Sequence, residues 1–253
     1  MASELLHAVM EIDEATLRDR LAQLVATELL YQHGRPPQAR YLFKHALVQD
    51  AAYASLLTRT RQRHHRRVAE VLEARFPATV DSEPELVTHH YTAVGDAAHA
   101  WGYWVQAGQQ AVQRSAHVEA MAHLRQGLAL LLTLPETPER HQHELTFQTT
   151  LGPTLMAVQG YSSPEVGEAY NRARVRCAQV GETPEVFTVL WGLWLFYFGQ
   201  GDHPTARALG EQCLHLAQRL EDTELLLEAH VTLGGALFHL GLQFPLTSLA
   251  WSH

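Results

Sequence analysis

The chain has little of what marks the common classes of secreted, membrane-bound and disulfide-linked proteins. It contains two cysteines, and no apolar run approaches the roughly 20 residues that a membrane-spanning helix needs. Its N-terminal stretch carries acidic residues where a secretory signal is basic, and no cleavage site follows an apolar segment. Neither Cys177 nor Cys213 belongs to a CxxC pair, so we expect buried free thiols in a reducing, cytoplasmic compartment.

Motifs of nucleotide and hydrolase chemistry are also missing. The chain has no GxxxxGK[ST] phosphate loop, its only lysine is Lys44, and no serine stands in a GxSxG nucleophile elbow. Its 17 histidines invite a metal site, but the pairs His64-His65 and His89-His90 are adjacent in sequence. Adjacent side chains diverge by about 100° on a helix, whereas helical zinc ligands are spaced i, i+4. We therefore expect no catalytic residue, cofactor or metal site, and expect at least one of His89 and His90 to bond a backbone carbonyl.

Charge is divided unevenly along the 253 residues. Residues 1–80 hold 11 basic and 9 acidic residues, whereas residues 81–253 hold 8 basic and 18 acidic ones. An acidic surface repels the phosphate backbone of nucleic acids. Any contact with nucleic acid therefore belongs to the first part of the chain.

A repeated pattern begins near Trp101 and is the strongest sign of organisation. Its anchor positions recur at intervals of 44, 42 and 40 residues, at Gly108, Gly152, Trp194 and Gly234. Each anchor lies within an apolar pattern of period 3.6, and Thr-Pro or Ser-Pro pairs mark several helix starts. Partner helices are predicted at residues 118–134, 164–180 and 204–220. The pattern predicts helical hairpins, with Ala206 and Gly210 at a close helix crossing.

The first 80 residues follow a different pattern. A segment from Glu14 to Leu30 predicts an amphipathic helix whose inner face carries Leu17, Leu21, Leu24 and Val25. Residues 29–32 and 40–43 flank a Gly/Pro turn and predict a β-hairpin. A helix or helix pair from Lys44 to Phe76 should follow. Helices around a two-stranded hairpin are the layout of a winged helix.

Four segments resemble a region of bacterial STAND-type ATPases, notably those fused to adenylate or guanylate cyclase or to kinase domains. They are YLFKHALVQDAAYASLL (41–57), RRVAEVLEARFP (66–77), ELVTHHYTAVGD (85–96) and AWGYWVQAGQQAVQRSAHVEAMAHLRQGLALLLTLPE (100–136). The resemblance extends over residues 12–242. It implies an all-α fold with a winged-helix-like head at residues 1–80 and an α-solenoid of tetratricopeptide-type hairpins at residues 81–253, the last repeat being incomplete.

In that family a phosphate-loop ATPase domain precedes the winged helix, and the repeats act as a sensor and regulatory arm. The resemblance thus implies a non-catalytic interaction and regulatory arm, here in a truncated form without ATPase or cyclase domains. Its partners would be a protein or peptide held by the repeats, and cognate ATPase or cyclase domains if these are encoded separately. The alternative is a winged-helix, DNA-binding transcription regulator whose repeats sense an effector.

The first candidate partner-binding residues form a basic run: Arg59, Arg61, Arg63, Arg66 and Arg67. An inner helix face made by Ala51, Ala52, Leu56, Leu57, Val68 and Leu72 would leave these arginines outside. A solvated face is the simplest interpretation. Contact with an acidic protein surface comes next, and contact with nucleic acid is the least favoured.

The second candidate residues are aromatic. Around residues 190–198, Leu190, Leu193, Trp194 and Tyr197 share the face expected between helices, whereas Trp191 and Phe198 fall partly outside it. Aromatic clusters of this kind usually belong to a core. Repeat arrays also bind peptides on their concave face, so Trp191 and Phe198 are candidates for a ligand groove.

The end of the chain departs from the repeat pattern. The predicted helix at residues 230–242 has no predicted partner, because Pro245 interrupts the pattern and eight residues remain at 246–253. Isolated helices shorter than about 12 residues are marginal. We therefore expect an open apolar face near Leu237, Phe238 and Leu240, and self-association through this end.

Overall fold

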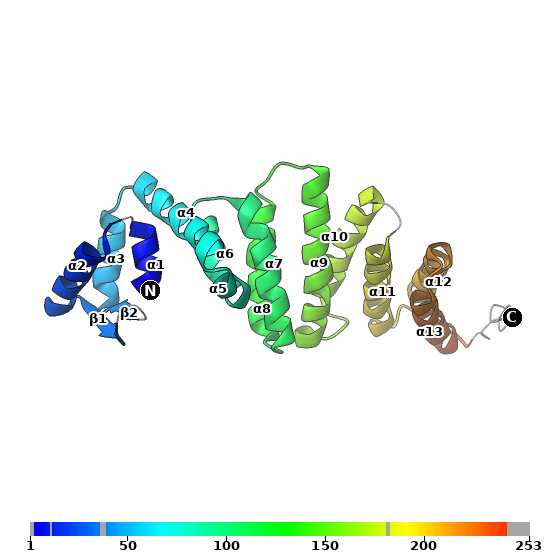
Figure 1. Cartoon of the computed structure of the whole chain (residues 1–253). Coiled ribbons are helices and arrows are strands. Elements are labelled where there is room, and N and C mark those ends of the chain that lie inside the picture. The colour runs from blue at the N-terminus through cyan, green and yellow to red at the C-terminus, as the bar shows by residue number, and fades with distance from the viewer. Residues whose placement is uncertain (1–2, 11, 36–38, 181–182, 242–253) are drawn as a thin grey trace. The chain divides into compact units, whose positions relative to one another are not determined.

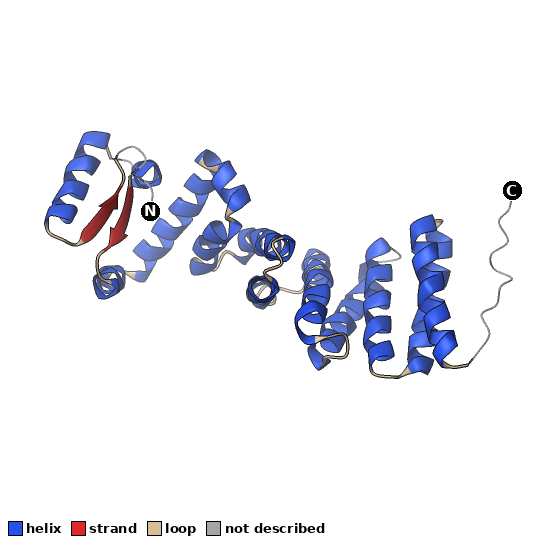
Figure 2. Cartoon of the chain, turned by 90° about the horizontal axis from the view of Figure 1, so that it is seen from below, coloured by secondary structure: helices blue, strands red, loops and turns tan. Residues whose placement is uncertain are grey.

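A computed structural model describes residues 3–10, 12–35, 39–180 and 183–241 (Figures 1 and 2). These residues form helices α1 to α13 and one two-stranded sheet, so the prediction of a predominantly helical chain is confirmed. None of the described helices is long and apolar enough to cross a membrane. The chain packs as two compact units, residues 1–103 and residues 104–253.

The first unit begins with two helices and a hairpin. They are α1 (Ser3–Met10), α2 (Glu14–Ala26), β1 (Leu30–His33) and β2 (Arg40–Phe43). The Asp13 carboxylate caps α2 by accepting the backbone N–H of Thr16 at 2.8 Å. The helix ends four residues before the predicted end, because the chain turns through Glu28, whose φ is 60°. The strands pair antiparallel, which confirms the predicted hairpin, and Leu30 lies opposite Phe43.

The predicted inner face of the first unit is wrong in two places. Leu17 and Leu21 are buried with Leu30, Ala39 and Tyr41, but Leu24 is exposed, because the four-residue strands offer only a short apolar surface. Helix α3 (Ala46–Ser55) has no buried residue. Of the set expected to point inward, Val68 and Leu72 are buried, whereas these four are exposed: Ala51, Ala52, Leu56 and Leu57.

The rest of the first unit is helical. It comprises α4 (Thr58–Arg75), α5 (Pro77–Ser82), α6 (Pro84–Ala93) and the start of α7 (Ala97–Gln113). Helices α3 and α4 are the pair predicted for residues 44–76. Helix α4 packs on α6, and both helices bury apolar side chains, among them Val68 and Leu72 of α4 and Val87 and Tyr91 of α6.

The second unit continues α7 with six more helices. They are α8 (His117–Leu131), α9 (Pro138–Gln159), α10 (Pro164–Val180), α11 (Pro184–Gly199), α12 (His203–Leu220) and α13 (Thr223–His239). From α8 onward each helix packs on the next, and α9 and α11 also contact α11 and α13 respectively. The predictions at residues 164–180 and 204–220 match α10 and α12 within one residue. Thr137 caps α9 as its Thr-Pro pair predicted, whereas Thr183 makes no such bond to α11.

Large side chains from neighbouring helices pack directly against glycines of the second unit. A Cβ atom added at Gly152 or at Gly192 would overlap the ring of Tyr170, and one at Gly108 would overlap Leu124. Gly210 lies at a close crossing, as predicted: an added Cβ would lie 3.1 Å from the backbone Cα of Leu233. These helices approach one another closely only where a side chain is missing.

The open apolar face predicted for the last helix differs from the exposed face of α13. Leu237 is only 6% exposed and belongs to the packed side of α13 with Leu233 and Ala236. Phe238 is exposed, as expected, and Leu240 is half-buried. The predicted exposed face was rotated about the helix axis relative to the true one, because neighbouring positions on a helix point about 100° apart. The predicted break at Pro245 and the segment 246–253 lie outside the described residues.

The crossing at Gly210 yields a stability prediction. Gly210→Leu should lower the free energy of unfolding by about 1–3 kcal/mol, because the group opposite is backbone and cannot rotate away. The matched control is Gly235→Ala, whose Cβ would lie 3.5 Å from Trp194 in ordinary contact. It should be neutral or stabilise by up to about 1 kcal/mol through helix propensity. Urea denaturation measures both, and equal stability of the two variants would contradict the crossing.

Candidate interaction surfaces

The five arginines of the basic run do not act as one surface. Arg66 pairs with Asp96, its Nη2 lying 3.3 Å from a carboxylate oxygen. The guanidinium of Arg61 lies over the ring of Tyr53, 5.1 Å from the centroid, and Arg67 also has a partner. Arg59 and Arg63 are exposed. Both positions are therefore accessible to an acidic partner.

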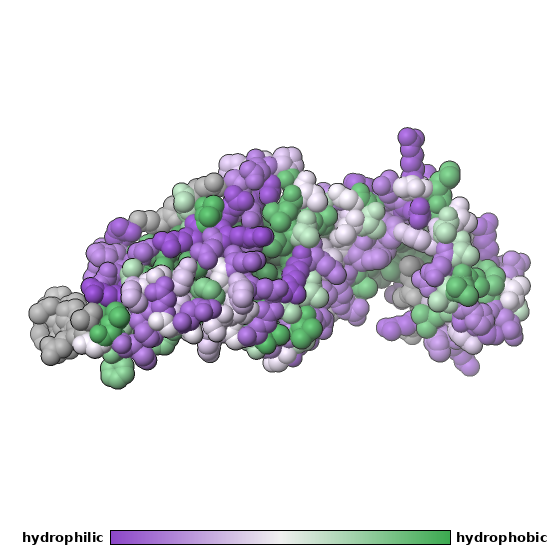
Figure 3. Space-filling view, turned by 180° about the vertical axis from the view of Figure 1, so that it is seen from behind, coloured by the Kyte–Doolittle hydropathy of each residue, from purple (hydrophilic) through white to green (hydrophobic). Residues whose placement is uncertain are grey.

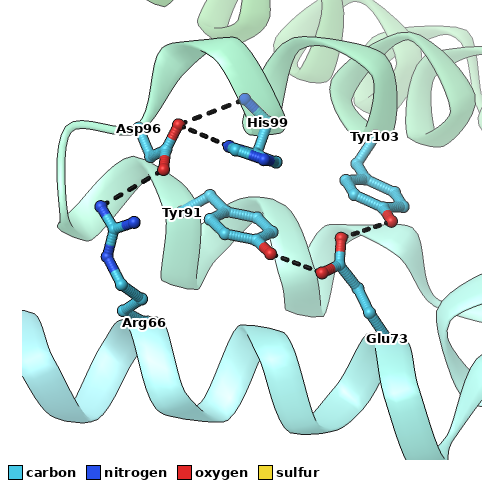
Figure 4. A network of polar contacts seen from close by, with 6 residues as sticks. All are labelled: Arg66, Glu73, Tyr91, Asp96, His99 and Tyr103. Atoms are coloured by element: carbon cyan, nitrogen blue, oxygen red, sulfur yellow. Dashed lines mark hydrogen bonds and ion pairs between the residues drawn. The ribbon is translucent and has the colours of Figure 1, made fainter.

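A polar network joins α4, α6 and the start of α7 (Figure 4). The carboxylate of Glu73 accepts hydrogen bonds from Tyr91 at 2.5 Å and from Tyr103 at 2.7 Å. Burial, and after it the bond to Glu73, raises the pKa of Tyr103 to about 12. Asp96 lies 2.8 Å from Nδ1 of His99, whose ring stacks on Tyr91. Both oxygens of Glu73 are engaged by phenols, so this network fixes helices rather than offering a free base.

Three histidine rings cluster where α3, α4 and α6 meet. Tyr53 Oη lies 2.9 Å from His65 Nε2, and His65 Nδ1 lies 2.8 Å from His90 Nδ1. His89 completes the cluster, with its ring centroid 5.7 Å from that of His65 and 5.3 Å from that of His90. A backbone carbonyl was expected as the partner of at least one of His89 and His90, and His90 bonds another imidazole instead. Among the described residues no group of three or more His, Cys, Asp or Glu side chains is arranged to hold a metal ion.

The short contact between His65 and His90 requires that only one of the two Nδ1 atoms carries a proton. A neutral imidazole has one donor and one acceptor nitrogen, whereas two protonated rings would direct N–H groups at each other. Burial, with the neighbouring His65 and His89, lowers the pKa of His90 to about 4. Burial also lowers the pKa of His65, helped by His89, His64 and Arg61. His65 and His90 therefore resist protonation.

Trp191 and Phe198 are both half-buried on α11 and lie seven residues apart, on one face of the helix. The ring of Phe198 stacks on Trp194 at 4.9 Å and meets His203 at 5.3 Å and His239 at 4.8 Å. Phe198 thus belongs to a cluster that joins α11, α12 and α13. The side chains of Trp191 and Phe198 both keep part of their surface accessible to solvent, so both remain candidates for contact with a ligand.

A hollow in the second unit was not predicted from the sequence. It measures about 440 Å³ and lies between α7, the start of α8 and α9. Its lining is neutral and rich in hydrogen-bonding groups: Gln109, Val112, Gln113, His117, Thr150, Pro153 and Thr154. Pro153 inside α9 was the available signal, because proline removes a helical hydrogen bond and often marks a functional irregularity. We call this hollow the α7–α9 groove.

The two thiols are buried, as predicted. Burial raises the pKa of Cys213 to about 12 and also raises that of Cys177. A nearby ion pair is equally enclosed: Arg176 Nε donates to Glu144 at 2.8 Å, and the Glu144 side chain is 4% exposed. Neither the thiols nor this ion pair offers reactive chemistry at the surface.

Exposed apolar side chains gather on the head, at the right of Figure 3. They lie on the hairpin and around α3, and include Tyr31, Leu42, Phe43, Leu47 and Leu57. Tyr31 and Leu42 are opposite each other across the hairpin and share its outer face. Apolar surface gathered in this way is typical of an interaction site.

Comparisons with known proteins add one relative. No family model matches the chain. Over 194 residues the chain is 27% identical to a protein of Rhizobium meliloti (strain 1021) described as uncharacterized. The match covers 76% of this chain and 19% of that protein, so the chain spans about a fifth of the relative's length.

The histidine cluster predicts a loss of stability in acid. Because the folded-state pKa of His90 is about 4, below the ordinary value of 6.5, its contribution is present above pH 6.5 and is lost as the pH falls toward 4. At pH 5 the loss should be about 1 kcal/mol after allowance for solvent screening. His90→Gln should flatten the fall of the melting temperature between pH 7 and pH 5, and the exposed control His33→Gln should not. Identical pH profiles for wild type and His90→Gln would contradict this account.

Proposed function

We propose that this chain is the non-catalytic interaction and regulatory arm of a STAND-type signalling ATPase, acting in the cytoplasm. In this proposal the first unit holds a winged-helix-like head, and α7 to α13 are tetratricopeptide-type hairpins of a solenoid. The observation that carries it is the recurrence of helix pairs at 40 to 44 residues, with the groove between successive first helices. Repeat arrays of this kind bind chains rather than transform substrates.

The packing order supports the repeat assignment. Helices α7, α9, α11 and α13 carry the anchors of the repeat and are the first helices of successive pairs. Helix α9 contacts α11, and α11 contacts α13, so first helices lie beside first helices. In solenoids such a row forms a continuous face that recognises peptides.

The lining of the α7–α9 groove suggests the class of ligand. Gln109 and Gln113 of α7 are exposed amides that both donate and accept hydrogen bonds. Val112 and Pro153 add apolar surface, and the groove has no charged lining residue among those described. An extended peptide offers alternating backbone donors and acceptors that match such amides. We therefore propose a peptide segment of a protein partner as the ligand.

Two further observations support an arm of a larger signalling protein. The chain spans about a fifth of its relative's length. The head also exposes apolar side chains at Leu42, Leu47 and Leu57. In this proposal that surface receives the cognate ATPase or cyclase domains, and Arg59 and Arg63 meet acidic groups at its edge.

Peptide display on the full chain tests the groove. Selected peptides should bind wild type, and Gln109→Ala with Gln113→Ala should weaken binding at least about tenfold through the loss of two or more hydrogen bonds. The matched control replaces the exposed glutamines Gln126 and Gln142, which lie outside the groove, and should bind as wild type does. Peptides that bind the groove variant as tightly as wild type would refute this site.

The alternative, a DNA-binding regulator, is favoured by the β1–β2 hairpin followed by outward Arg59 and Arg63. A regulator binds duplex DNA with an affinity that falls steeply with salt. We expect no such binding, because Arg66 is paired with Asp96 and two arginines remain outward. Fluorescence anisotropy with duplex DNA at about 50 and 200 mM salt decides between the two. Tight binding that Arg59→Ser with Arg63→Ser abolishes would establish the alternative.

A further inference from the structure

Helix α13 carries an apolar stripe on the side away from its buried face. Leu227 is 69% exposed, Val231 68% and Phe238 79%. With Gly234 they follow one another at intervals of four, three and four residues, which places all four on one side of the helix. The buried residues of α13, among them Ala236, face the opposite way. The α13 stripe is therefore a continuous apolar surface beside no described helix.

The equivalents of Val231, which are Thr149 in α9 and Trp191 in α11, are half-buried in the preceding repeats, as is Phe198, the equivalent of Phe238 in α11. The other equivalents of Leu227 and Phe238 are buried. Leu227 corresponds to Phe187 in α11 and to Leu145 in α9, which are 4% and 1% exposed. Phe238 corresponds in α9 to Met156, which is 8% exposed. Helix α9 is packed by α10 and α11, and helix α11 by α12 and α13. The positions of Leu227 and Phe238 thus carry apolar side chains like those that are buried between helices in earlier repeats. In those repeats a neighbouring helix covers them.

The α13 stripe is complementary to itself. Consider two antiparallel copies of α13 related by a twofold axis that passes level with the point between residues 232 and 233. Leu227 of one copy then lies opposite Phe238 of the other, and Val231 lies opposite Gly234. In this pair of α13 helices, Leu227 and Phe238 therefore meet each other, and each Val231 lies against a glycine. The second unit already packs in this way, with Leu124 filling the space at Gly108.

Charges at the edge of the α13 stripe are also complementary in this arrangement. Glu224, Glu228 and His239 border the stripe on one side. In an antiparallel pair about a twofold axis, like edges meet, so His239 of one copy lies between the two glutamates of the other. Nδ1 of His239 lies 3.0 Å from the carbonyl of Gly235 and donates to it, so Nε2 is the ring nitrogen that faces a polar contact with the partner copy in this arrangement.

We propose that a second copy of this chain occupies the α13 stripe, forming a twofold-symmetric dimer through Leu227, Val231, Gly234 and Phe238. Symmetric, isologous contacts are the commonest way in which proteins form dimers. One helix face buries less than the roughly 1,200 Å² of a stable interface, so the dimer is weak and depends on concentration. The proposal does not rest on the proposed function, because it concerns α13 alone.

Sedimentation of the full chain from about 1 to about 200 μM tests the dimer, a range suited to a weak interface. Wild type should shift from monomer toward dimer across this range. Leu227→Glu and Phe238→Glu should each raise the dissociation constant at least about tenfold, because each buries a carboxylate against an apolar side chain. The matched controls Val118→Glu and Val175→Glu alter valines that are 69% and 62% exposed on other helices, and should dimerise as wild type does.

Cross-linking tests the geometry. Both native cysteines are buried, so Val231→Cys supplies the reactive thiol, and a short bis-maleimide should link two copies. The control Val175→Cys should give no such product. Thermal melting of each variant separates loss of dimer from loss of fold.

Four results would overturn the proposal. These are a wild-type chain that stays monomeric throughout, a dimer that persists in both glutamate variants, and equal cross-linking of the two cysteine variants. The fourth is a monomer that dimerises only when residues 242–253 are removed, which would make that segment the occupant of the stripe.

Discussion

The second unit depends on the ring of Tyr170, which lies between two glycines. Gly152 of α9 and Gly192 of α11 leave the space that this fully buried ring occupies, so one side chain of α10 holds both neighbouring helices. Burial raises the pKa of the phenol, and its hydroxyl makes no hydrogen bond within the described residues. An unsatisfied buried hydroxyl costs free energy. The position is therefore one where the fit of the ring outweighs a missing hydrogen bond.

The first unit is held by a different balance of forces. Its α4, α6 and α7 segments are joined by polar contacts of Glu73 and Asp96 in addition to apolar burial. Helix α3, by contrast, has no buried residue, and Tyr53 connects it to α4 through His65 and Arg61. Local stability follows buried contact. Helix α3 is thus weakly anchored in this unit, and its Tyr53 contacts His65, whose other ring nitrogen bonds His90 of α6.

Local signals predicted α10 and α12 well, because such signals act within one turn of the chain, whereas α13 begins seven residues before its predicted start at residue 230. The helices α10 and α12 begin and end where prolines, capping residues and the 3.6-residue period placed them. Facing directions were predicted less well. Leu24, Leu57 and Leu237 all belong to apolar segments, and which side of such a segment is buried depends on the neighbour that covers it. The bond between His65 and His90 likewise joins residues 25 positions apart.

The groove escaped prediction for a related physical reason. Its lining of glutamine, valine, histidine, threonine and proline contains no acidic or basic cluster and no catalytic motif, so no local sequence pattern pointed to it. Only the spacing of two helices brings Gln113 near Pro153. The α13 stripe uses other residues on another helix, so no side chain serves both surfaces. Binding of a peptide between α7 and α9 is therefore compatible with pairing through α13, and pairing would place two such grooves in one assembly.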